Sequence, residues 1–132
     1  MHATPSKARR LLAAALLAGF GLSAPATAGR TDDAAAHANR LAYDATLKCA
    51  VANGLASDDH HDAGDAAKAD EYRTKARRSF DLAYKIGAKL GLADGQIARD
   101  LEFAQDSELP RMMRDRSYYL STAATCKAVG LM

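Results

Sequence analysis

Apolar side chains recur every three or four residues through most of the chain, the spacing that places them on one face of an α-helix. The pattern appears in four segments, which span residues 31–53, 65–90, 94–108 and 111–129. No stretch shows the apolar–polar alternation that is typical of a half-buried strand. The sequence therefore predicts an all-α protein.

Residues that start or stop helices bound these segments. A side chain able to cap a helix N-terminus opens each of the first three: Thr31 or Asp32, Asp65 and Asp94. A glycine or proline follows each segment: Gly54, Gly91, Pro110 and Gly130. Residues 54–64 are mostly polar and are predicted to connect the first two helices, and proline is expected to break or restart the helix between the last two.

Each predicted helix has an apolar stripe that is expected to face the core. The first stripe comprises Ala38, Leu41, Ala45, Cys49 and Ala52. The second comprises Ala69, Tyr72, Ala76, Phe80, Ala83, Ile86 and Leu90, and Gly87 interrupts it, which favours a close helix contact or a bend. In the third segment, Ile97, Leu101, Ala104 and Glu108 mark one face, with Phe103 off to the side. In the fourth, one face carries Met112, Tyr119, Ala123 and Cys126.

The first 28 residues have the pattern of a cleavable signal peptide. Lys7, Arg9 and Arg10 precede an apolar run over 11–24, and Ala26-Thr27-Ala28 gives a small-x-small cleavage site. Fourteen residues are too few to span a bilayer core, which needs roughly 20, although an uncleaved anchor is the alternative. We expect an exported, periplasmic or secreted protein in which residues 29–132 form one helical domain without a membrane anchor.

Removal of the leader changes the charge balance. Residues 29–132 contain 15 basic and 16 acidic side chains, so the basic character of the whole chain belongs to residues 1–28. This near-neutral charge argues against a nucleic-acid partner, which favours a clustered basic surface. Alanine accounts for 22 of these residues, which permits close packing but gives each helix little apolar area to bury.

The two cysteines, Cys49 and Cys126, are expected to form a disulfide because an even number of cysteines in an exported chain favours pairing. Two buried free thiols are the alternative. Both residues lie near the C-terminal ends of their predicted helices, which a regular up-and-down bundle would place roughly 25 Å apart. We therefore predict a compact, non-regular four-helix bundle in which the third segment crosses over the others.

The densest group of possible metal ligands surrounds His60 and His61, with Asp58, Asp59 and Asp62 beside them. Imidazole and carboxylate groups suit zinc, nickel or copper. Adjacent residues rarely converge on one ion, however, so a solvated loop with acidic helix-capping residues is the favoured interpretation. We expect no metal and no cofactor, and keep His60 and His61 as the alternative.

Two regions are candidate partner-binding surfaces. Arg73 and Arg77 share a face of the second segment, for which a solvated charged face is the usual outcome and a surface for an anionic partner is the alternative. Tyr118 and Tyr119 lie in the richest apolar–aromatic stretch, and such residues are common in interfaces as well as in cores. The sequence contains no phosphate loop, no nucleophile-elbow motif and no paired carboxylates, so we expect no enzymatic activity and no catalytic residues.

The layout, with cysteines in Leu47-Lys48-Cys49-Ala50 and Thr125-Cys126-Lys127, loosely resembles small helical periplasmic proteins of Proteobacteria. It is also similar in outline to the periplasmic immunity proteins that neutralise type VI secretion amidase effectors. That resemblance implies a helical fold and a protein partner, and assigns no residue a role. We therefore expect a protein-binding module, such as an immunity or inhibitor protein, whose partner is another envelope or secreted protein. A small-ligand or metal-handling envelope protein is the alternative.

Overall fold

The computed structural model describes the backbone of residues 26–132 and the side chains of residues 29–132, so most of the predicted signal peptide lies outside the described residues. The described chain forms four α-helices: α1 (Ala26–Asp62), α2 (Ala66–Lys89), α3 (Asp94–Arg114) and α4 (Arg116–Ala128). Their packing confirms the predicted all-α fold. None of the described helices has a stretch apolar and long enough to cross a membrane.

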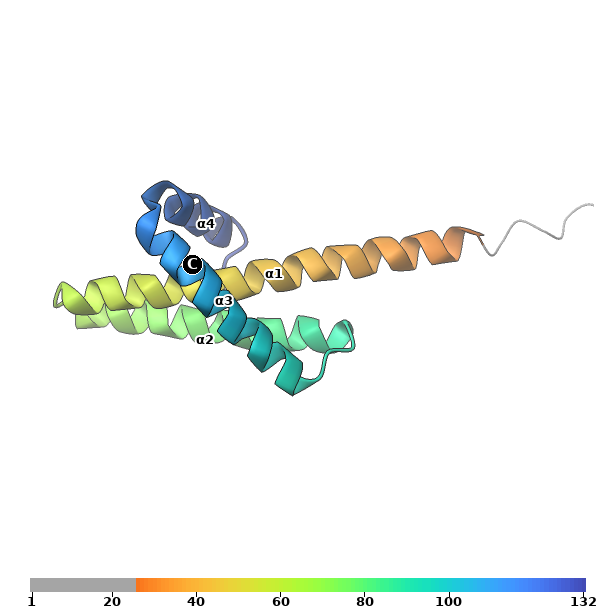
Figure 1. Ribbon diagram of the computed structural model, residues 1–132, viewed down its shortest axis with the longest axis horizontal. Helices are drawn as coiled ribbons and strands as arrows, with labels where there is room; N and C mark the ends of the chain where they lie inside the picture. The colour runs from red at the N-terminus through yellow and green to blue at the C-terminus, as the bar shows by residue number, and fades with distance from the viewer. Residues whose placement is uncertain (1–25) are drawn as a thin grey trace, which may run out of the picture.

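Helix α1 is the centre of the arrangement. It pairs with α2 as a long hairpin, α3 crosses this hairpin, and α4 packs on α1 (Figure 1). Between Tyr43 and Ser57, α1 is therefore covered on several sides and contributes most of the core, including Leu47, Val51 and Ala52. The crossing of the third helix, which the sequence predicted, is confirmed (Figure 1).

The predicted bounds of the first helix are wrong at both ends. Helix α1 begins at Ala26, before the predicted caps Thr31 and Asp32, and continues through Gly54 to Asp62. Glycine costs a helix interior about 1 kcal/mol relative to alanine. Burial of the neighbouring Asn53 and Ala56 stabilises the helix across this position. Residues 54–62, predicted as a polar connection, are consequently helical.

The predicted helix break at Pro110 is also wrong, because Pro110 lies inside α3. Proline removes one backbone hydrogen bond, whose acceptor would be the carbonyl of Asp106. Asp106 is exposed, so water can satisfy that carbonyl. Met112, predicted for the last helix, is instead a buried residue of α3 and holds its end on the core. Helix α4 starts after Asp115, whose side chain accepts a hydrogen bond from the Tyr118 N–H.

Part of the predicted first stripe is not buried. Ala38 is exposed and Leu41 is 58% exposed, because α1 extends past the end of α2 before it reaches the body of the protein (Figure 1). Cys49 and Ala52 are buried as predicted. The stripes of the other three helices face inward, although several of their large members are half-buried.

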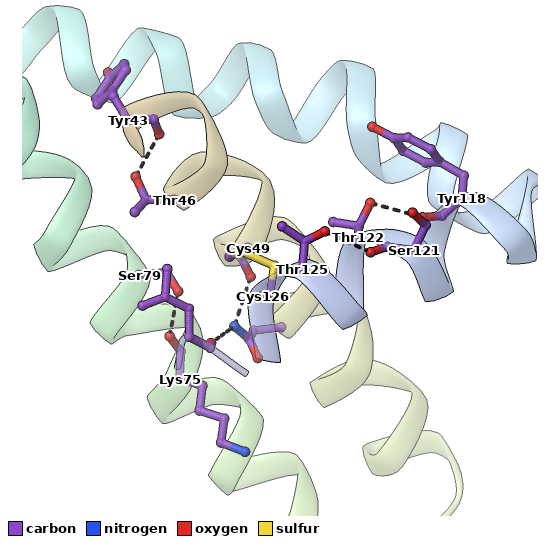
Figure 2. The surroundings of a disulfide bond; sticks show 12 residues. Tyr43, Thr46, Cys49, Lys75, Ser79, Tyr118, Ser121, Thr122, Thr125 and Cys126 are labelled. Carbon is purple, nitrogen blue, oxygen red and sulfur yellow. Dashed lines mark hydrogen bonds between the residues drawn. A yellow bond between two sulfur atoms is a disulfide. The ribbon is translucent and has the colours of Figure 1, made fainter. Parts of the chain in front are cut away.

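The predicted disulfide between Cys49 and Cys126 is confirmed, with Cα atoms 5.6 Å apart and both residues 1% exposed (Figure 2). Cys49 lies in the middle of α1 and not near its end. The disulfide therefore does not require the C-terminal ends of α1 and α4 to lie close together. The bond therefore joins the last turn of α4 to the central helix.

The C-terminal tail is fastened beside the disulfide. Gly130, with φ of 73°, ends α4 in the left-handed conformation, and the Leu131 N–H donates to the Cys126 carbonyl at 2.8 Å. This turn buries the Leu131 side chain against the disulfide. The Asn53 side-chain amide, fully buried in α1, donates to the Leu131 carbonyl at 2.7 Å and to the Cys49 carbonyl at 2.9 Å.

Gly87 permits the close contact that the sequence predicted. A Cβ atom at this buried position of α2 would lie 2.6 Å from Ile97 Cδ1 and 3.3 Å from Tyr43 Cε2. We expect Gly87→Ala to lower the free energy of unfolding by roughly 1–3 kcal/mol, because overpacking outweighs the gain in helix propensity. Urea denaturation measures the change.

The matched control for this prediction is Gly54→Ala, in which a Cβ atom would meet nothing within 4 Å. Here the gain in helix propensity acts alone, and we expect stabilisation of about 0.5–1 kcal/mol. Equal shifts of the same sign in the two variants would contradict a close contact at Gly87.

Candidate functional site

An open groove of about 340 Å³ lies between α1 and α3. Both helices line it: Arg40, Tyr43, Asp44, Leu47 and Lys48 from α1, and Asp100, Phe103, Ala104, Ser107 and Glu108 from α3. The groove exists because α3 crosses α1 near the point where α1 leaves the body of the protein.

The base of the groove contains a hydrogen bond between its two walls. Tyr43 is 1% exposed, and its hydroxyl donates to Asp100 Oδ2 at 2.9 Å. The other carboxylate oxygen of Asp100 accepts from the Gln96 side chain at 2.9 Å. Burial, together with the hydrogen bond and the negative charge of Asp100, raises the pKa of Tyr43 above its usual range. The phenol therefore stays protonated and ties α1 to α3.

This arrangement predicts a loss of stability at alkaline pH. The folded protein keeps the Tyr43 proton above the ordinary pKa of 10.0, whereas the unfolded chain releases it. The contribution is complete below that pKa and is lost as the pH rises above it. We expect Tyr43→Phe to flatten the fall in unfolding free energy between neutral and alkaline pH. Denaturation curves over this range test it, and Tyr84→Phe, at an exposed tyrosine of α2, should keep the parent's slope.

The far end of the groove is closed by a second polar link. Glu108 Oε2 accepts from the Tyr118 hydroxyl at 2.5 Å, and Glu108 Oε1 lies 3.7 Å from Lys48 Nζ. The guanidinium of Arg111 stacks over the Tyr118 ring at 3.7 Å. Tyr118, one of the predicted partner-binding residues, thus fixes a wall of the groove. Tyr119 is half-buried, and burial raises its pKa.

Phe103 stands at the edge of the groove and is 74% exposed, the highest exposure among the large apolar side chains described. It lies one position from the buried Ala104, so the helical rotation that buries Ala104 turns the phenylalanine toward solvent. The sequence pattern placed Phe103 off the stripe but did not identify it as a binding residue. It did not indicate Arg40, Asp44 or Lys48, because the groove brings together residues more than 50 positions apart.

Both walls of the groove carry charged side chains. Arg40 and Lys48 lie two turns apart on α1, and Asp100 and Glu108 lie two turns apart on α3. Asp44 sits between the two cations. Leu47 and Ala104 lie beneath the groove and are almost fully buried, so the exposed Phe103 supplies most of its apolar surface. The site thus offers apolar contact flanked by both signs of charge, a composition suited to a peptide chain and not to a simple ion.

The other predicted partner residues lie elsewhere. Arg73 and Arg77 are on the exposed face of α2, whereas Tyr118 and Tyr119 are half-buried residues of α4. Arg73 pairs with Asp70 at 2.6 Å. The four predicted partner-binding residues thus lie on two different helices, α2 and α4.

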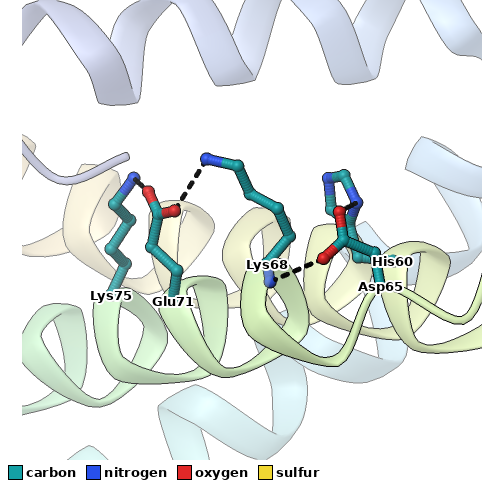
Figure 3. A network of polar contacts seen from close by, with 5 residues as sticks. All are labelled: His60, Asp65, Lys68, Glu71 and Lys75. Carbon is teal, nitrogen blue, oxygen red and sulfur yellow. Dashed lines mark hydrogen bonds and ion pairs between the residues drawn. The ribbon is translucent and has the colours of Figure 1, made fainter.

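The neighbouring face of α2 carries a surface network of ion pairs (Figure 3). Lys68 and Lys75 both lie 2.7 Å from the carboxylate of Glu71, and their hydrogen bonds lower its pKa to about 2. Such exposed pairs contribute little to stability and are screened by salt.

The histidine pair lies in the last turns of α1 and not in a loop, which overturns the expected loop. The His60 ring stacks on Tyr72 with ring centroids 5.3 Å apart. The Nδ1 atom of His60 is 3.9 Å from Asp65 (Figure 3). His61 is the next helical residue and points about 100° away around the axis. The described residues contain no group of three or more side chains placed to hold a metal ion.

The chain was compared with protein-family models, with curated proteins and with solved structures. None of the three comparisons found a match.

Proposed function

We propose that the protein is a non-enzymatic binding module of an oxidising, extracytoplasmic compartment, and that the groove between α1 and α3 binds a segment of a partner protein. The observation that carries this proposal is the exposed Phe103 at the edge of the groove. Large aromatic side chains supply much of the binding energy of protein interfaces. Here the aromatic ring adjoins apolar surface and charges of both signs.

The scaffold supports this function because it holds the walls of the groove in fixed positions. The Tyr43–Asp100 hydrogen bond ties the two walls at the base, and the Tyr118–Glu108 hydrogen bond ties the end. A site that is already ordered loses less conformational entropy when a partner binds. The polar contacts inside the groove thus favour recognition over catalysis.

The disulfide supports the assignment of compartment. Cys49 and Cys126 form a disulfide. Structural disulfides persist in oxidising environments such as the bacterial periplasm. Together with the predicted leader, this favours export. Within this class, an immunity or inhibitor protein that binds a secreted effector matches the layout noted in the sequence.

The proposal makes Phe103 the residue whose truncation weakens binding most. We expect Phe103→Ala to reduce partner capture from the extracytoplasmic fraction roughly tenfold or more, as for aromatic residues that dominate other interfaces. Quantitative mass spectrometry of the proteins that copurify with the parent and with the variant measures the loss.

Met113→Ala is the matched control, because Met113 is also on α3, is 68% exposed and does not line the groove. Its partner capture should equal that of the parent. If every copurifying protein is retained equally by both variants, the groove is not the binding site.

A further inference from the structure

The first part of α1 forms an arm that stands away from the rest of the protein (Figure 1). Residues 29–42, called the α1 arm below, are exposed except for the half-buried Asn39. At 1.5 Å per residue the arm is about 21 Å long. Helices gain most of their stability in proteins from tertiary packing, and the arm has little of it.

Four charged residues are arranged along one side of this arm and its junction with the body. Arg30, Asp33, Arg40 and Asp44 fall within about a quarter of the helix circumference, given 3.6 residues per turn. The order of their signs is positive, negative, positive, negative. When the helix is read in the opposite direction, the order of signs is reversed, so two antiparallel copies place each positive charge beside a negative one.

We propose that the α1 arm pairs antiparallel with the α1 arm of a second copy of this chain. With His37 of one copy opposite His37 of the other, Arg30 lies beside Asp44 of the second copy. In the same register Asp33 lies beside Arg40 of the second copy. The two-fold symmetry repeats both pairs, so four ion pairs form along the contact.

The apolar surface of the arm agrees with this register. Leu41 is 58% exposed and lies next to the charged side of the helix, with Ala34 and Ala38 on the same stripe. In the antiparallel pair, Leu41 packs opposite residue 33 of the other arm and close to Ala34. Small side chains at these positions allow the two helices to approach closely, while the charged flanks fix their direction.

A parallel pair would lose these contacts. In parallel helices the charged flank of one arm faces the opposite flank of the other, which carries Thr31, Ala35 and Ala42. The charge pattern therefore selects the antiparallel arrangement. The arm length fits as well, because a contact centred on residue 37 extends from Arg30 to Asp44, the exposed residue at the junction of each arm with its own body.

Two charge-reversal variants of the full chain test this pairing. One variant carries Arg30→Glu and Arg40→Glu, and the other carries Asp33→Lys and Asp44→Lys. Each variant places like charges opposite each other in a self-pair, whereas an equimolar mixture restores all four opposite-charge pairs. Sedimentation velocity should show a concentration-dependent dimer for the parent, monomers for each variant alone and a heterodimer for the mixture.

Two controls make the result decisive. Arg73→Glu with Arg77→Glu changes the net charge equally on α2 and should leave the dimer intact. His37→Cys should form a disulfide-linked dimer under mild oxidation, and Asp62→Cys, at the exposed far end of α1, should not. A monomeric parent, a variant that dimerises like the parent, or a mixture that stays monomeric would each overturn the proposal.

Discussion

Replacement of both cysteines by alanine is expected to lower the free energy of unfolding by about 4.5 kcal/mol, the chain-entropy value for a closed loop of this size. The cysteines are separated by 77 positions, so the bond restrains most of residues 29–132 in the unfolded state. Calorimetry or chemical denaturation of the parent and the double variant measures the difference. Dithiothreitol should destabilise the parent by a similar amount and leave the double variant unchanged.

Loss of the disulfide should also destabilise one part of the protein more than the rest. Helix α4 buries little beyond Ala123, Cys126 and the following Leu131, whereas α1 and α2 share a long interface. Hydrogen exchange should therefore increase more in residues 116–132 than in the α1–α2 hairpin. Uniform exchange across the chain would contradict the role of the bond as the attachment of α4.

Ile97→Ala is expected to destabilise the protein by roughly 2–5 kcal/mol, the range for truncation of a buried isoleucine. Ile97 is 1% exposed and packs where α3 meets Gly87 of α2 and Tyr43 of α1. Its truncation leaves a cavity at the contact of three helices. Urea denaturation of the purified variant measures the change.

Phe103→Ala serves as the matched control for Ile97→Ala on the same helix. Because Phe103 is 74% exposed, its truncation should change the free energy of unfolding by no more than about 0.5 kcal/mol. The two substitutions thus separate stability from binding. A large loss of stability in Phe103→Ala would show that the ring belongs to the core.

Local signals predicted much of the fold because helix starts and stops depend on residues close in sequence. Asp65 caps α2 through the Lys68 N–H, and Gly91 and Gly130 end helices with positive φ, as predicted. Gly54 and Pro110 carry the same local signals and yet lie inside helices. Packing of the surrounding helices outweighs the local cost at these two positions, and that packing is not visible in a single segment.

The candidate site was less predictable because its walls come from distant parts of the chain. Tyr43 and Asp100 are 57 positions apart, and neither belongs to a motif. Helical spacing places Arg73 and Arg77 on a shared face. The spacing does not show whether that face adjoins a groove. Tyr118 was predicted as a partner-binding residue and contacts Glu108 at the groove, whereas Phe103 was noted only as lying off the apolar stripe.

A photoreactive amino acid placed at position 103 in the exported protein tests most directly whether the groove binds a protein partner. Illumination of intact cells should produce one defined crosslinked species from position 103 and none from position 113. We expect a second substitution in the groove, Lys48→Glu, to reduce the yield of this species. Equal crosslinking from both positions, or none from position 103, would contradict it.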